Sequence, residues 1–110
     1  MSAGIYNIEI DQGSDFETNL TVDGTSLDGY SARGQIRATI RSAAVLGEFD
    51  FTITGATSTG GTIEMSLPNY ISRDMPAGIH VYDVEIYNDT TRKALRLLKG
   101  TCTIVQGVTK

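Results

Sequence analysis

Segments in which apolar and polar residues alternate run through most of this sequence, and turn-forming residues separate them. The longest is Ala32 to Arg41, where small or apolar residues at even positions alternate with arginine, glutamine and threonine at odd positions. A period of two is typical of a strand with one buried face. Comparable patterns occupy residues 6–10, 16–22, 48–53 and 62–67. These patterns predict a nearly all-β chain.

Two longer β-rich segments, HVYDVEIY and ALRLLKGTCTIV, flank the polar sequence NDTTRK and predict a β-hairpin. The residues predicted to point inward are His80, Tyr82, Val84, Ile86, Leu98, Cys102 and Ile104. Those predicted to point outward are Val81, Tyr87, Leu95, Leu97 and Val105. A sheet with one face in water should alternate apolar and polar residues cleanly. Because both faces of this hairpin carry apolar residues, we expect another chain to cover the outer one.

The 110 residues are enough for one domain with one core. About seven short strands predict a single immunoglobulin-like β-sandwich of two sheets over residues 1–110. A small closed barrel is the alternative. Residues 68–75, PNYISRDM, lack the alternation and predict one helical turn that begins at proline. The predicted core includes Phe16, Ile36, Phe49, Phe51, Ile63, Met65, Leu67, Val84, Ile86 and Leu98.

Few of the residues present are of the types that carry out catalysis. The one histidine, His80, and the one cysteine, Cys102, both fall on the inward face of the predicted hairpin. A nucleophilic cysteine needs an accessible, electropositive setting, whereas an inward one is expected to be a buried small apolar residue. We therefore expect no enzyme, no catalytic residue and no cofactor.

Three loops offer oxygen or backbone groups to a ligand. Residues 11–15 (DQGSD) and 23–28 (DGTSLD) contain carboxylates of the kind that bind Ca²⁺, but aspartate, glycine and serine are also the usual composition of turns. Residues 55–61 (GATSTGG) lack the lysine of a phosphate-binding loop and predict a hairpin loop instead. No metal site is expected.

The charge balance narrows the class of partner. Nine basic and thirteen acidic residues give a net charge of −4, which argues against nucleic acid. The N-terminal sequence has neither a basic start nor an apolar segment, and no stretch approaches the length that spans a membrane. A lone cysteine favours folding in a reducing cytoplasm. We expect neither targeting nor membrane insertion.

Basic residues gather on one predicted face. Arg33, Arg37 and Arg41 recur every four residues on the outward face of their predicted strand. One interpretation is a solvated surface that keeps the protein soluble. The other is a polar rim around an apolar patch, as at protein interfaces. The second predicts an interface made by these arginines together with Val81, Tyr87, Leu95 and Leu97.

The order of motifs along the chain resembles a family of small virion proteins of tailed bacteriophages. The motifs are IEIDQGSDF, LDGYSARGQIR, VYDVEIYN and RLLKGTCTIV, and the family has "IEQGADF", "LTGYTARMQIR", "GVYDLEL" and "RLLEGxVxV" in the same order. The sequence is also similar to the N-terminal domain of baseplate upper proteins. The resemblance covers nearly the whole chain.

The resemblance implies a β-sandwich subunit of a virion that is assembled in the host cytoplasm. The expected role is a structural adaptor in the tail, baseplate or fibre-attachment region, in contact with other virion proteins and forming a homo-oligomer or ring. Two alternatives stay open: a decoration protein on the capsid, and a carbohydrate-binding β-module that would use exposed tyrosines.

Overall fold

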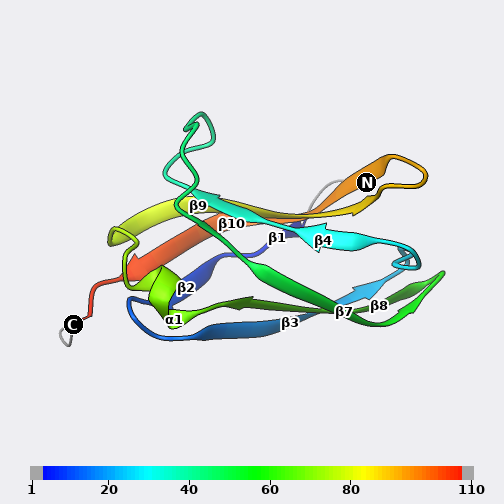
Figure 1. The fold of residues 1–110 in the computed structure, drawn as a ribbon, viewed down its shortest axis with the longest axis horizontal. Coiled ribbons are helices and arrows are strands. Elements are labelled where there is room, and N and C mark those ends of the chain that lie inside the picture. Colours follow the sequence, from blue (N-terminus) through cyan, green and yellow to red (C-terminus); the bar gives the residue numbers. More distant parts are fainter. Residues whose placement is uncertain (1–3, 108–110) are drawn as a thin grey trace.

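The computed structural model describes residues 4–107, which form two β-sheets packed face to face (Figure 1). The large sheet contains β1 (Gly4–Ile5), β2 (Ile8–Asp11), β4 (Ser31–Arg33), β5 (Gln35–Arg37), β6 (Gly47–Glu48), β9 (Gly78–Asn88) and β10 (Lys93–Val105). The small sheet contains β3 (Phe16–Asp23), β7 (Asp50–Thr57) and β8 (Gly60–Leu67). The predicted immunoglobulin-like two-sheet sandwich is therefore confirmed, and the closed barrel is not formed.

The seven predicted strands are all present, three of them in broken form. The first is β2 with β1 before it, and both pair in parallel with β10. Between them the side chain of Asn7 accepts a hydrogen bond from the backbone N–H of Thr101 at 3.0 Å. The third is divided at Gly34 into β4 and β5, which both pair with β9. The fourth is divided at Phe49 into β6, which contains the predicted Glu48, and β7. Among the described residues, β1 is the strand that the pattern did not predict.

The core lies between the sheets and contains most of the predicted residues. Ile36, Phe49, Ile63, Met65, Leu67, Val84 and Ile86 are buried, and Phe16, Phe51 and Leu98 are partly buried against them. The Phe49 ring packs edge-on to Tyr82 and Phe51, with centroids 5.8 and 6.2 Å away. Leu27 and Met75 are also buried, although both lie in loops where no alternation marks them.

The outward assignment of Leu95 and Leu97 is wrong. The register between β9 and β10 shifts between Arg96 and Leu98, so Leu97 is the extra residue of a β-bulge. Leu95 pairs with the buried Ile86, and both Leu95 and Leu97 pack against the inner cluster that contains Ile86. A bulge moves side chains to the other face, and sequence alternation alone does not reveal it.

The third predicted strand also ends earlier than expected, at Arg37 rather than Arg41. The chain turns at residues 39–42, where the N–H of Ser42 donates to the carbonyl of Thr39 at 3.1 Å. The predicted inward position of Ile40 is therefore wrong, since its side chain is 87% exposed. Arg41 lies in this turn and does not share a strand face with Arg33 and Arg37.

The predicted helical turn is confirmed as α1 (Asn69–Ser72), with Pro68 at its N-cap. α1 connects β8 of the small sheet to β9 of the large sheet. The buried Ser72 hydroxyl donates to the carbonyl of Ser14 at 3.0 Å and accepts from the N–H of Gly13 at 3.1 Å. These bonds fix α1 against the turn between β2 and β3. The hairpin turn within residues 55–61 is confirmed as well, at Ser58 and Thr59.

Replacing Gly34 tests the close packing at the break between β4 and β5. A Cβ atom at this position would lie 2.5 Å from the carbonyl oxygen of Asp83 and 3.0 Å from Phe51. We expect Gly34→Ala to lower the free energy of unfolding by about 1–3 kcal/mol, because the backbone must move. Ser31→Ala, at an exposed site on β4, should change it by less than about 0.5 kcal/mol. Equal denaturation midpoints for the two variants would contradict this packing.

Candidate protein-interaction surface

The candidate surface is the outer face of the large sheet, the face turned away from the small sheet. Strand β9 runs through its middle, with β10 on one side and β4 and β5 on the other. Cross-strand partners place Glu85 between Arg96 and Arg33, and Asp83 beside Lys99. A central line of carboxylates is therefore flanked by cations on the neighbouring strands.

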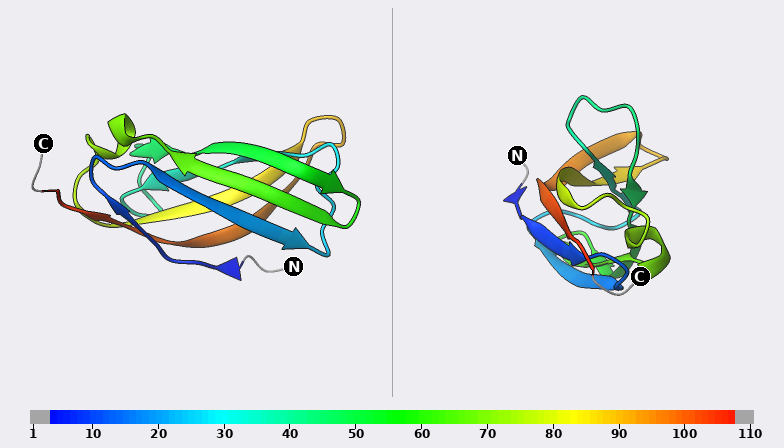
Figure 2. Two further views of the ribbon diagram at one scale, coloured as in Figure 1. Left: turned by 90° about the horizontal axis from the view of Figure 1, so that it is seen from below. Right: turned by 90° about the vertical axis from the view of Figure 1, so that its left-hand side faces the viewer.

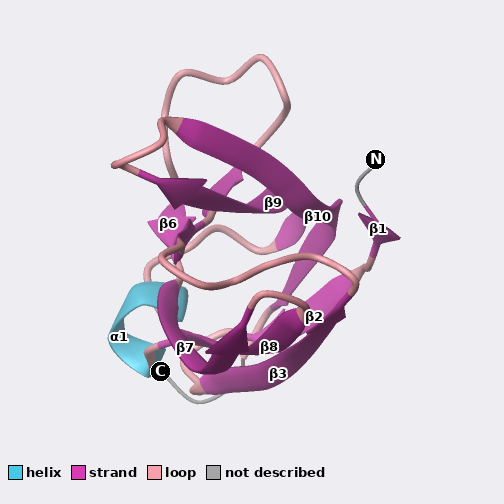
Figure 3. Ribbon diagram, turned by 90° about the vertical axis from the view of Figure 1, so that its right-hand side faces the viewer, coloured by secondary structure: helices cyan, strands magenta, loops and turns pink. Residues whose placement is uncertain are grey.

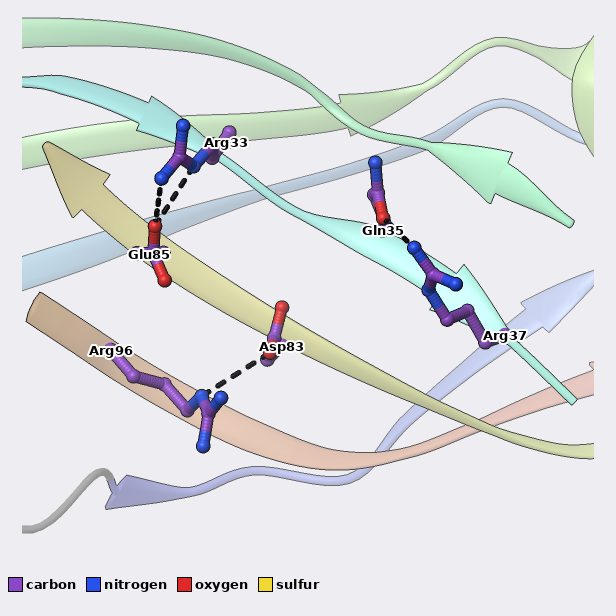
Figure 4. Close-up of polar contacts among 6 residues, drawn as sticks. All are labelled: Arg33, Gln35, Arg37, Asp83, Glu85 and Arg96. Carbon is purple, nitrogen blue, oxygen red and sulfur yellow. Dashed lines mark hydrogen bonds and ion pairs between the residues drawn. The ribbon is translucent and has the colours of Figure 1, made fainter. Parts of the chain in front are cut away.

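Two ion pairs neutralise this line (Figure 4). The guanidinium of Arg33 donates two hydrogen bonds to Glu85, the one from Nε at 2.8 Å, and this bonding raises the pKa of Arg33 above its ordinary value. The same guanidinium lies 4.4 Å from the centre of the Tyr87 ring. Arg96 pairs with Asp83 at 3.2 Å. Arg33 thus covers Tyr87, which leaves less of the ring available to a partner.

Arg37 supports the β5–β6 loop (residues 38–46). Its guanidinium donates to the carbonyls of Ser42 and Ala43 at 2.8 and 3.0 Å and to the side chain of Gln35 at 2.7 Å. Figures 1 and 3 show this loop standing away from the sandwich on the side of the large sheet. Arg37 therefore holds a projecting loop.

Large apolar side chains lie beside the ion pairs on the same face. Ile5, Ile40 and Val81 line one hollow together with charged residues of this face, and Phe49, Phe51 and Tyr82 line it from the core side. Ile79 precedes the buried His80 on β9, so it points to the outer face as Val81 does. Ile5, Ile40 and Ile79 are 75, 87 and 71% exposed. We call Ile5, Ile40, Ile79 and Val81 the apolar patch.

The structure brings together only part of the predicted interface. Val81, Tyr87, Arg33 and Arg37 lie on the outer face, whereas Leu95 and Leu97 belong to the core and Arg41 to the β5–β6 loop. Ile5, Ile40 and Ile79 were not predicted. The alternation of β9 already implied the position of Ile79, but the positions of the other two depend on the break after β1 and the turn after β5.

His80 and Cys102 are direct cross-strand partners and both are buried, as predicted. Nε2 of His80 lies 2.7 Å from the carbonyl oxygen of Pro76, so this nitrogen donates a hydrogen bond to the carbonyl rather than to the thiol. Burial raises the pKa of the Cys102 thiol to about 12. At neutral pH the sulfur is therefore a protonated, inaccessible part of the core.

One of the loops considered as ligand sites, residues 11–15, has a structural partner. Oδ1 of Asp15 accepts hydrogen bonds from the backbone and side-chain N–H groups of Asn69, at 2.8 and 2.9 Å, at the start of α1. Within residues 4–107, no group of three or more histidine, cysteine, aspartate or glutamate side chains could hold a metal ion. The described helix is also too short to cross a membrane.

Comparison with known proteins finds similarity of fold at low sequence identity. No protein-family model and no curated protein sequence matches the chain. A family 123 glycoside hydrolase from Clostridium perfringens is 12% identical with a TM-score of 0.48; the match covers all of this chain and 24% of the hydrolase chain. The extracellular domain of the voltage-gated sodium channel β4 subunit is 14% identical with a TM-score of 0.43, and 98% of each chain is covered. Neither similarity assigns an activity.

Trypsin cleavage after Arg41 measures how firmly the β5–β6 loop is held. We expect Arg37→Gln to increase this cleavage rate roughly five- to tenfold, because two charge-assisted hydrogen bonds to the loop backbone are lost. Arg33→Gln removes a guanidinium from the neighbouring strand without touching the loop and should leave the rate unchanged. If both variants were cleaved at the wild-type rate, Arg37 would not restrain the loop.

The accessibility of the Cys102 thiol can be measured with a disulfide reagent such as Ellman's reagent at pH 8. We expect no measurable reaction while the chain is folded, since the sulfur is buried and its pKa is raised to about 12. One thiol per chain should react after unfolding in guanidinium chloride, because the pKa then returns to about 8.5. Rapid reaction of the folded protein would place the thiol at the surface.

Proposed function

We propose that the chain is a structural subunit of a tailed-phage virion, an adaptor in the tail, baseplate or fibre-attachment region. It acts through protein–protein contacts and performs no catalysis. The β-sandwich agrees with the fold that the motif resemblance implied. The observation that carries the proposal is the apolar patch on the outer face of the large sheet.

The composition of this face favours a protein partner. A fully buried interface core is apolar and its rim is polar. The apolar patch supplies the first, and the paired charges of β4, β9 and β10 supply the second. Charged residues at the rim of an interface add little affinity, but they orient a partner and exclude others whose charges do not match.

The charge pattern also favours unlike surfaces in contact. If two copies packed these outer faces together about a two-fold axis along β9, Glu85 would face Glu85 and Arg96 would approach Arg33. Like charges held opposite each other are destabilising. A contact between this face and a different surface, as in a ring of subunits or against another virion protein, avoids that repulsion.

Cryo-electron microscopy of particles of the phage whose genome encodes the chain tests the proposal. We expect the chain to form one ring, or a few rings, of about a dozen copies each at the tail end. A neighbouring subunit should cover the apolar patch. Hundreds of copies on the shell would identify a capsid decoration protein instead. Absence of the chain from purified particles would refute a structural role.

A double variant, Ile40→Ser with Ile79→Ser, tests the patch itself. Both side chains are exposed, so each change should alter the stability of the free chain by no more than about 0.5 kcal/mol. We expect quantitative mass spectrometry of purified particles to show its incorporation reduced at least about tenfold, since apolar area is lost from the contact. Tyr70→Ser, which changes an exposed apolar residue on α1, should be incorporated normally.

A further inference from the structure

The free edge of β3 is a second feature that could bind a protein. In the described part of the chain, β3 pairs with β8 along one side only, and all eight residues follow one unbroken register. Figure 2 shows β3, in blue, at one margin of the small sheet. An edge strand of this length presents unpaired backbone N–H and C=O groups to any extended chain.

The geometry identifies which backbone groups are free. In an antiparallel ladder the N–H and C=O of one residue point to the same side, and successive residues alternate. The N–H of Gly24 donates to the carbonyl of Thr59 at 2.8 Å, on the β8 side. Even-numbered residues of β3 therefore face β8. Glu17, Asn19, Thr21 and Asp23 turn their backbone groups to the free edge.

Most devices that protect a sheet edge are absent from β3. Natural edge strands commonly carry lysine, proline or a bulge, or they are very short. The sequence FETNLTVD contains neither lysine nor proline, and its register has no bulge. The opposite edge strand, β7, has an irregularity between Thr54 and Thr57. Of the two edges of the small sheet, β3 is the regular one.

The side chains of the small sheet define the partner's chemistry. Its three strands carry the acidic residues Glu17, Asp23, Asp50 and Glu64 and no lysine or arginine. Glu17 and Asp23 are exposed at the two ends of the edge, while Phe16, Leu20 and Val22 are half-buried on the other face. A strand added here would place cations opposite the acids and apolar side chains beside the half-buried residues.

We propose that β3 accepts an extended, cationic segment of another protein as a fourth strand of the small sheet. The segment has lysine or arginine at two positions six residues apart, with apolar residues alternating between them. A second copy fits poorly, because antiparallel pairing of two β3 strands about Leu20 sets Glu17 opposite Asp23. The proposal does not depend on the outer face of the large sheet.

Two blocked peptides, acetyl-KVTVTVK-amide and acetyl-EVTVTVE-amide, test the chemistry of the edge. We expect isothermal titration of the full chain to show the cationic peptide binding at least about tenfold more tightly, because two cross-strand charge pairs are gained. The difference should narrow as salt is raised. Equal binding of the two peptides, or no binding of either at millimolar concentration, would overturn the proposal.

Thr21→Pro tests the edge itself, because it removes an N–H that points away from β8. We expect the variant to keep the wild-type circular dichroism spectrum and to bind the cationic peptide at least about tenfold more weakly. Thr21→Val keeps the N–H and should bind as wild type does. A folded Thr21→Pro variant with unchanged affinity would contradict the proposal.

Charge reversal provides a test that does not depend on the proline variant folding. Glu17→Lys with Asp23→Lys should reverse the preference, so that the anionic peptide binds more tightly than the cationic one. An unchanged preference would refute the role of these acids. If the wild-type chain formed a dimer, and if Thr21→Pro or the double charge reversal abolished that dimer, a second copy and not a cationic segment would occupy the edge.

Discussion

The pairing of β9 with β10 is the interaction on which the rest of the structure depends. These two strands are the longest in the described chain, and β1, β2, β4 and β5 all attach to one or the other. Their inner face supplies buried residues from His80 to Ile104, and their outer face supplies three of the four members of the two ion pairs, the fourth being Arg33 of β4. The bulge at Leu97 sets which side chains each face receives. A change of register by one residue would exchange core and surface.

The two faces of this pair serve different physical roles. The inner face is closed by Phe49, Met65 and their neighbours, so His80 and Cys102 are buried between the two sheets. The outer face is left with charges that neutralise one another and with an apolar patch that no described segment covers. The small sheet differs from this outer face, because the charged side chains on its strands are all acidic and the edge formed by β3 is unprotected. The outer face of the large sheet and the free edge of β3 therefore differ in the surface that they offer to a partner.

Much of the fold could be predicted from the sequence, whereas only part of the candidate surface could. Strand positions follow from alternation, because a half-buried strand must place apolar side chains on one side. The inward positions of Val84 and Ile86 and the placement of Pro68 follow from equally local rules. Leu97 and Ile40 were misplaced because a bulge and a turn interrupt the alternation without a distinctive residue.

The sequence by itself determined the fold class, the hairpin and most of the core, since these depend on the spacing of apolar residues and on turn-forming residues. The tertiary structure alone decided the surface. Arg37 was predicted to rim an interface, yet it binds the carbonyls of Ser42 and Ala43, and Arg33 turns to Glu85 and Tyr87. Ile5 joins Val81 only because β1 lies beside β10. Such contacts join residues distant in sequence, and no local pattern encodes which partner a side chain will meet.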